Sequence, residues 1–300
     1  MLSNPIIFPR NQAMSRPLKT FLFWNFSIIV GLLFTLKTLD LLFPLPSLLK
    51  SSFFLVACLS SFFAAVISAQ KYYGPRGKEK LNSTFSKAGL HGPGLSIAIS
   101  PLAFLFIGLL LYPLFFEQYF TLNTFIRSRS ITGIVSLIGW VFPILGIAVS
   151  DTFGWRSFAL PHWQVSSTAF SSSILIGILN GFSLILLMNF QYPFDLLFSI
   201  RLLLFSIFQS FLLTAIFNYS KGNSWPCLIF SVSSYFTIVV DSEFLMMVTT
   251  IGYVLISAYL INQYGRVHLC EGHRVKNFYK KVMSSKLKSQ ILDLEEDSEI

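Results

Sequence analysis

The sequence predicts an all-α protein that crosses a membrane several times. Of its 300 residues, 54% are hydrophobic and only 12% are charged, whereas soluble domains carry about 25% charged residues. The apolar residues gather in long runs, and the basic residues lie mostly between these runs or at the ends. A chain of this composition cannot bury its apolar surface in one water-soluble core, so we expect a polytopic integral membrane protein.

Eight apolar runs approach the roughly 20 residues that a helix needs to cross the hydrocarbon core. In chain order they cover residues 20–42, 51–69, 95–116, 131–150, 168–189, 195–217, 224–241 and 244–262. We therefore predict a single transmembrane domain over residues 20–262. A cytoplasmic segment, residues 1–19, precedes it, and a cytoplasmic tail, residues 263–300, follows and turns from basic to acidic.

Three charged residues interrupt the apolar runs. Lys37 and Asp40 lie three residues apart near the end of the first run, so they share a helix face and are expected to pair. Arg201 lies one to two turns inside the sixth run. We expect its long side chain to snorkel or to pair within the bundle.

The basic residues predict the orientation. With eight spans, 17 of the 22 Lys and Arg residues fall on one side of the membrane. Because basic loops stay in the cytoplasm, both termini are predicted to be cytoplasmic, in a plasma or inner membrane. Basic residues spread over loops and tails serve orientation, so we expect membrane lipids and no nucleic acid as partners.

The three cysteines do not form a disulfide framework. Cys58 and Cys227 lie in apolar runs, where they are expected to pack as small hydrophobic residues. Cys270 follows the last run in "RVHLCEGHRVK", which leaves open palmitoylation or metal binding with His268 and His273, both on weak signals. We predict no metal and no cofactor.

One polar stretch, "DTFGWRSFALPHWQ" at residues 151–164, follows directly on the fourth run. It resembles the first motif of the CPBP family of intramembrane proteases, which includes the CAAX prenyl endopeptidases and reads EE-x-GWRG-x-x-LP-x-x-Q. The matching residues are Gly154, Trp155, Arg156, Leu160, Pro161 and Gln164. "YYGPRGKEKL" and "NYSKGNSWP" resemble the family's basic loop and the turn before its seventh span. The resemblance covers about residues 70–240 and implies a CPBP-like bundle.

The chain departs from this family at the catalytic positions. Asp151 and Thr152 align with the family's Glu pair. Asn180 and Leu184 align with its F-x-x-x-H motif, and Ser231 and Tyr235 with its H-x-x-x-N motif. In the family, the His and Asn side chains are thought to position water and to hold developing oxyanion charge, which needs polar donors. Leu184 is not one. Residues 163–267 contain no His and residues 118–242 no Glu, so no shift of register restores either residue.

Three functions therefore remain open. The first is a CPBP-like pseudoenzyme that binds a lipidated peptide, a lipid or another membrane protein in the former active-site cavity. The second is a divergent endopeptidase that uses Asp151 as its base, with Ser231 and Asn180 as donors. The third is a transporter or channel in which the charged residues of the spans line a path. The first is our main hypothesis.

The side chains of the motif also carry structural expectations. Asp151 and Arg156 are expected to form a structural pair at the cytoplasmic end of the fourth span. Five residues of α-helix would place them about 140° apart around the axis, so the pair needs an irregular backbone. Trp155 and Trp163 are expected to anchor helix ends at the membrane interface, and His162 is expected at the surface.

Overall fold

A computed structural model describes residues 15–85, 92–116, 134–188, 195–239 and 243–270. Within these ranges the protein is helical, with short turns and no strand. The helices, in chain order, are α1 (Arg16–Leu42), α2 (Ser47–Cys58), α3 (Ser60–Ser83), α4 (Gly92–Phe116), α6 (Ile134–Ser150), η1 (Asp151–Ala159), α7 (Leu160–Gln164), α8 (Ala169–Met188), α9 (Leu196–Tyr219), α10 (Trp225–Val239) and α11 (Glu243–His268). The prediction of an all-α fold is confirmed for these residues.

In the described ranges, seven of the eight predicted apolar runs coincide with one helix each, whereas the run 51–69 crosses the break at Leu59 between α2 and α3. Five helices are long and apolar enough to cross a membrane, namely α1, α4, α8, α9 and α11. The pair α2 and α3 makes a sixth candidate span, bent by 49° at the break between them. In the described ranges α6 has 17 residues and α10 has 15, so a total of eight spans stays a prediction. Most of the N-terminal segment and most of the tail lie outside the described residues.

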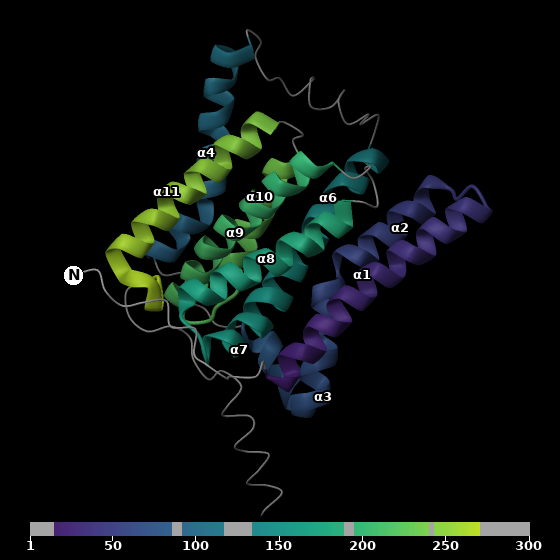
Figure 1. Ribbon diagram of the computed structural model, residues 1–300, viewed down its shortest axis with the longest axis horizontal. Coiled ribbons are helices and arrows are strands. Elements are labelled where there is room, and N and C mark those ends of the chain that lie inside the picture. The colour runs from purple at the N-terminus through teal and green to yellow at the C-terminus, as the bar shows by residue number, and fades with distance from the viewer. Residues whose placement is uncertain (1–14, 86–91, 117–133, 189–194, 240–242, 271–300) are drawn as a thin grey trace, which may run out of the picture.

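The helices pack into one bundle around α9 and η1. In Figure 1, α1 and α2 lie at one end of the long axis, α4 and α11 lie at the other, and α6, α8, α9 and α10 lie between them. α8 packs along α9, α1 along α3, and α10 against both α4 and α6. The short η1 helix contacts α3, α6, α8, α9 and α10, so its side chains reach the centre of the bundle.

Local chemistry explains where the helices begin and end. α1 ends just before the "FPLP" segment, because the two prolines cannot continue a helix. Inside α3 the backbone leaves the helical conformation at Gly74, where φ is +62° and Pro75 follows; a residue without a side chain tolerates that conformation best. Asp195 caps the N-terminus of α9, since its carboxylate accepts hydrogen bonds from the Leu197 and Phe198 amides.

A buried polar network ties three helices together inside the apolar core. The Asn25 side chain of α1 donates to Ser183 Oγ of α8 at 3.1 Å. Its amide oxygen accepts from Ser60 and Ser61 of α3 at 3.0 and 2.7 Å. An amide in an apolar span is costly unless it is paired, so these bonds fix the position of α1 against α3 and α8.

The charged residues of the spans pair differently from our expectation. Asp40 forms its ion pair with Lys50 of α2, at 2.7 Å, whereas Lys37 was the expected partner. The turn after α1 brings the start of α2 back towards the end of α1, and this places Lys50 beside Asp40. Arg201 pairs with Glu243, the first residue of α11. Pairing of Arg201 was one of the two predicted outcomes, but sequence reasoning did not identify the partner.

Candidate functional site

The stretch that opens with Asp151 forms a π-helix, which is the structural origin of the site. η1 continues α6 without a break, and it runs through Asp151–Ala159. In a π-helix each hydrogen bond joins residues five apart, so these residues lie one above the other on the same face. Arg156 Nη2 consequently lies 3.4 Å from Asp151 Oδ1. The predicted pair therefore forms, and the irregular backbone that it needed is the π-helix.

Asp151 also contacts polar side chains from two other helices. Asn180 of α8 donates to Asp151 Oδ1 at 3.5 Å. Ser231 and Tyr235 of α10 donate to the other oxygen, Oδ2, at 3.1 and 3.2 Å. The Asp151 carboxylate is only 1% exposed, and each of its oxygens contacts at least two of these groups. The structure thus brings together four of the predicted site residues around Asp151.

The Arg156 guanidinium extends this arrangement to α9. Its Nη1 donates to Ser210 Oγ at 2.9 Å, while Nη2 faces Asp151. A planar fork suits this arrangement, because it holds its two terminal nitrogens at a fixed separation. We refer to this group as the Asp151 cluster, and its members are Asp151, Arg156, Asn180, Ser210, Ser231 and Tyr235. It connects η1 with α8, α9 and α10, and every member is buried.

Two of the motif-matched residues, Thr152 and Leu184, do not contact the Asp151 carboxylate through a hydrogen bond. Thr152 Oγ1 donates to the carbonyl of Ala148 in its own helix, at 2.8 Å. Leu184 is 1% exposed and packs in an apolar cluster with Ile29, Leu202 and Tyr235. Leu184 cannot form a hydrogen bond, so the position that aligns with the histidine of the family motif is apolar in this chain.

The structural residues of the motif pack tightly against α1 and α3. Gly154 lies so close to α3 that an added Cβ would sit 2.5 Å from Ser61 Cβ. Trp155 is fully buried and meets Phe21 edge-on, with ring centroids 5.1 Å apart. Pro161 lies in α7, which continues η1 directly.

The two tryptophans of the stretch are therefore core residues. Trp163, like Trp155, is buried, so the expectation that both anchor helix ends at the membrane interface is wrong. The π-helix packs against α3, and α7 packs against α8; Phe21 of α1 contacts the Trp155 ring. This cover removes both rings from the interface.

His162 is a packed residue rather than a surface residue. Its Nδ1 lies 2.6 Å from the Phe158 carbonyl oxygen, and its Nε2 lies 2.8 Å from the Tyr73 hydroxyl. A carbonyl can only accept, so Nδ1 carries the proton of the neutral ring and Tyr73 donates to Nε2. Burial lowers the pKa of His162 to about 4, because the charged imidazolium would lose its hydration. Our expectation of a surface histidine is corrected accordingly.

Several buried polar atoms near the cluster have no hydrogen-bond partner among the described residues. Gln164 is 0% exposed, and neither atom of its side-chain amide is paired. Trp155 Nε1 and Arg156 Nε also have no hydrogen-bond partner among these residues, and Arg156 Nη2 makes only its ion-pair contact with Asp151. A buried polar group without a partner costs about 1–3 kcal/mol. Three side chains of the stretch 151–164 thus carry buried atoms that a polar ligand could pair with.

Cys270 lies just past α11 and is 3% exposed. Burial raises the pKa of its thiol to about 11, and this disfavours the reactive thiolate. Among the described residues, no group of three His, Cys, Asp or Glu side chains is placed to hold a metal ion. His273, the other candidate ligand, lies outside the described residues.

No family model matches this chain, and no curated protein matches it either. The resemblance to the CPBP family thus stays a prediction that rests on the quoted motifs. The contacts around Asp151 are independent of that resemblance. Sequence reasoning missed Ser210 and the Asn25 network, because serines and a single asparagine in apolar runs resemble ordinary span residues. The signal for Asn25 was an amide inside a predicted span, where it needs partners.

Proposed function

We propose that this chain is an eight-span membrane protein of CPBP-like architecture, with both termini in the cytoplasm, that binds a membrane ligand and does not cleave peptides. The observation that carries the proposal is the state of Asp151. Its carboxylate is buried, pairs with Arg156 and accepts hydrogen bonds from Asn180, Ser231 and Tyr235. Both oxygens are committed to the protein's own side chains.

This arrangement argues against proteolysis. A general base must reach the proton of its water within hydrogen-bond distance, and the groups around Asp151 already occupy its two oxygens. A protease also needs donors aimed at the developing oxyanion, and removing one such donor typically costs about a hundred- to a thousandfold in rate. Leu184 offers none, and the central spans contain neither Glu nor His.

The unpaired atoms of Trp155, Arg156 and Gln164 support binding. The indole N–H and guanidinium N–H groups donate, and the Gln164 amide both donates and accepts. A ligand that carries a carbonyl or carboxyl group would complete this set. A lipidated peptide and an acyl lipid both have such groups, and so does a backbone segment of another membrane protein. These are the ligand classes of the hypothesis drawn from the sequence.

The endopeptidase alternative is favoured by one specific contact. Ser231 Oγ donates to Asp151 Oδ2 at 3.1 Å, so one donor of that alternative lies beside its base. The transporter alternative finds less support, because the Asp40–Lys50 and Arg201–Glu243 pairs are both partly exposed and share no residue with the Asp151 cluster.

Two measurements test the proposal. Protein in liposomes should release no more product from a prenylated CAAX-type peptide than the Arg156→Ala variant. Turnover that disappears in Asp151→Asn would establish the enzyme instead. The second measurement identifies, by mass spectrometry, what copurifies from the native membrane.

Gln164→Leu gives the binding test a sharp form. This change removes both unpaired amide atoms and keeps a similar volume, so it should reduce the copurifying ligand while the ligand-free protein becomes more stable. Ser173→Ala is the matched control, since the Ser173 hydroxyl is buried but paired with the Ala169 carbonyl. If Gln164→Leu retains the ligand and lowers stability, the amide is purely structural and the binding proposal fails.

A further inference from the structure

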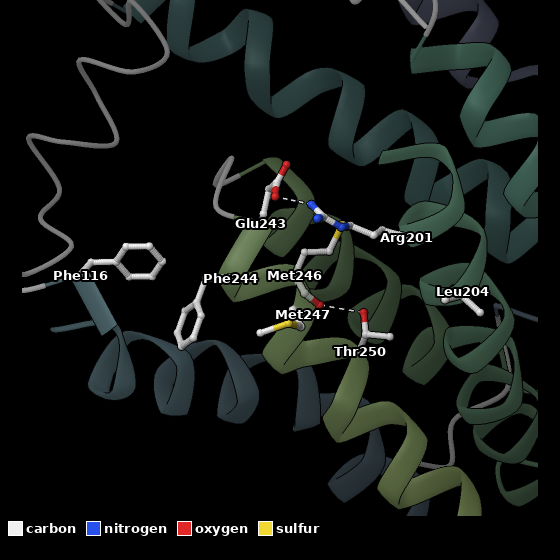
Figure 2. Close-up of a pocket in the computed structure, with 8 residues that line it drawn as sticks. All are labelled: Phe116, Arg201, Leu204, Glu243, Phe244, Met246, Met247 and Thr250. Carbon is white, nitrogen blue, oxygen red and sulfur yellow. Dashed lines mark hydrogen bonds and ion pairs between the residues drawn. The ribbon is translucent and has the colours of Figure 1, made fainter. Parts of the chain in front are cut away.

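A pocket separate from the Asp151 cluster opens between the end of α4 and the starts of α9 and α11. Its volume is about 410 Å³, which lies within the range of small-molecule sites. Figure 2 shows an ion pair, Arg201 with Glu243, beside apolar side chains from the start of α11 and from the end of α4. None of these residues belongs to the Asp151 cluster.

The ion pair offers both signs of charge at one place. The Arg201 and Glu243 side chains are 35% and 69% exposed. The described contact joins Arg201 Nη1 to Glu243 Oε2. A guanidinium has five N–H donors and a carboxylate has two acceptor oxygens, so each side chain can bind a further group without breaking the pair.

Apart from Thr250, the other side chains that line the pocket are apolar, and several of them are exposed. Phe116, Leu204 and Met247 are each about half exposed, at 48%, 47% and 51%. Phe244 contacts Phe116 edge-to-face, with ring centroids 5.5 Å apart. An ion pair bordered by exposed apolar side chains matches a molecule with a charged head and a hydrocarbon body.

The place of the pair along its helices fits the same kind of molecule. Glu243 is the first residue of α11, and Arg201 lies about 8 Å along the axis from the start of α9, at 1.5 Å per residue. On helices that cross a membrane, this depth is the boundary between headgroups and hydrocarbon.

We propose that this pocket binds a zwitterionic phospholipid with a primary ammonium, of the phosphatidylethanolamine class. The phosphate lies beside Arg201 and the ammonium beside Glu243, while an acyl chain follows Leu204 and Met247. An anionic headgroup would meet repulsion from Glu243, and a quaternary ammonium cannot donate a hydrogen bond to its carboxylate. The proposal rests on the membrane-spanning arrangement proposed above, but not on the Asp151 cluster.

Native mass spectrometry of delipidated protein tests this directly. Phosphatidylethanolamine, phosphatidylcholine and phosphatidylglycerol with identical acyl chains are added one at a time, and the retained lipid is counted. The ethanolamine lipid should be retained most. Arg201→Gln and Glu243→Gln should each lower its affinity about tenfold, which corresponds to the loss of one charge-assisted hydrogen bond. Glu243 is exposed, so its variant should stay folded.

Lys50→Gln is the matched control. It breaks an exposed ion pair with Asp40, and neither residue lines this pocket; retention should not change. Equal retention of the choline lipid would overturn the headgroup assignment. Preferred retention of the glycerol lipid that depends on Arg201 alone would replace it with an anionic site. Retention as high in both pocket variants as in the control would overturn the site, while the Gln164 result would stand independently.

Discussion

The Asp151–Arg156 pair gives the sharpest test of the reasoning about the site. Arg156→Met removes the positive charge and keeps a long, flexible side chain. At 3.4 Å, two unit charges attract by about 5 kcal/mol at the effective dielectric constant of about 20 that suits protein sites. Removing one member also leaves the other charge buried. The free energy of unfolding should therefore fall by about 3–5 kcal/mol.

A double-mutant cycle separates this pair from general packing. Asp151→Asn should cost about as much as Arg156→Met, because it leaves the guanidinium unpaired. The double variant buries neither charge, so it should lose less than the sum of the two single changes, by about 3 kcal/mol. Unfolding in mixed micelles, with a denaturing detergent as the variable and tryptophan fluorescence as the signal, measures all four proteins.

Thr152→Val is the internal control for the cycle. It removes a hydroxyl that bonds only to the carbonyl of Ala148, so it should change stability by about 1 kcal/mol or less. If Thr152→Val proves more damaging than Arg156→Met, or if the two charge changes are additive, the pair does not hold the bundle. Intact stability of Arg156→Met together with loss of a measurable activity would make the cluster a working site.

Four further measurements test other parts of the structure. Burial lowers the pKa of His162 in the folded protein to about 4 from an ordinary 6.5. The free energy of unfolding is therefore highest above about pH 6.5, where the ring is neutral in both states. Stability should decline by up to about 3 kcal/mol as the pH falls towards 4, because the unfolded chain takes up the proton first; melting curves of His162→Gln should lose this slope. At pH 8 the Cys270 thiol, with its pKa raised to about 11, should react with a maleimide about a hundredfold more slowly than in the unfolded chain, as followed by mass. Gly154→Ala should cost about 2 kcal/mol, because its Cβ would meet Ser61. Gly31→Ala, with open space around it, should instead stabilise the helix by a few tenths to about 1 kcal/mol.

The sequence predicted the helices well because long apolar runs have few alternatives in a membrane. It also singled out Asp151, Arg156, Asn180 and Ser231, through a motif resemblance that fixed their spacing. The π-helix could not be read from the residues. A π-helix is less stable than an α-helix in an isolated segment. Here it is stabilised by contacts with α3, α8, α9 and α10, which exist only in the folded bundle.

The errors share one physical cause. Trp155, Trp163 and His162 were placed at the membrane interface because each follows soon after an apolar span. Proximity to a span end in the sequence does not say whether another helix covers that end. Here α3 folds over the stretch, and Tyr73 from this helix hydrogen-bonds the imidazole. Long-range cover of this kind leaves no local pattern in a single sequence.

The π-helix has a consequence for how the segment between Asp151 and Arg156 can change in length. A π-turn holds one residue more than an α-turn, so losing any one of the four intervening residues would let the segment relax into an α-helix. The guanidinium would then be four residues from the carboxylate, on the same face of an ordinary α-helix. The turns on either side would keep their register, because the π-turn holds its extra residue within one turn of the helix. A related chain that is one residue shorter here would therefore keep the Asp151–Arg156 pair, whereas the loss of one residue from the α-helical turns of α6 would rotate everything beyond it by about 100°.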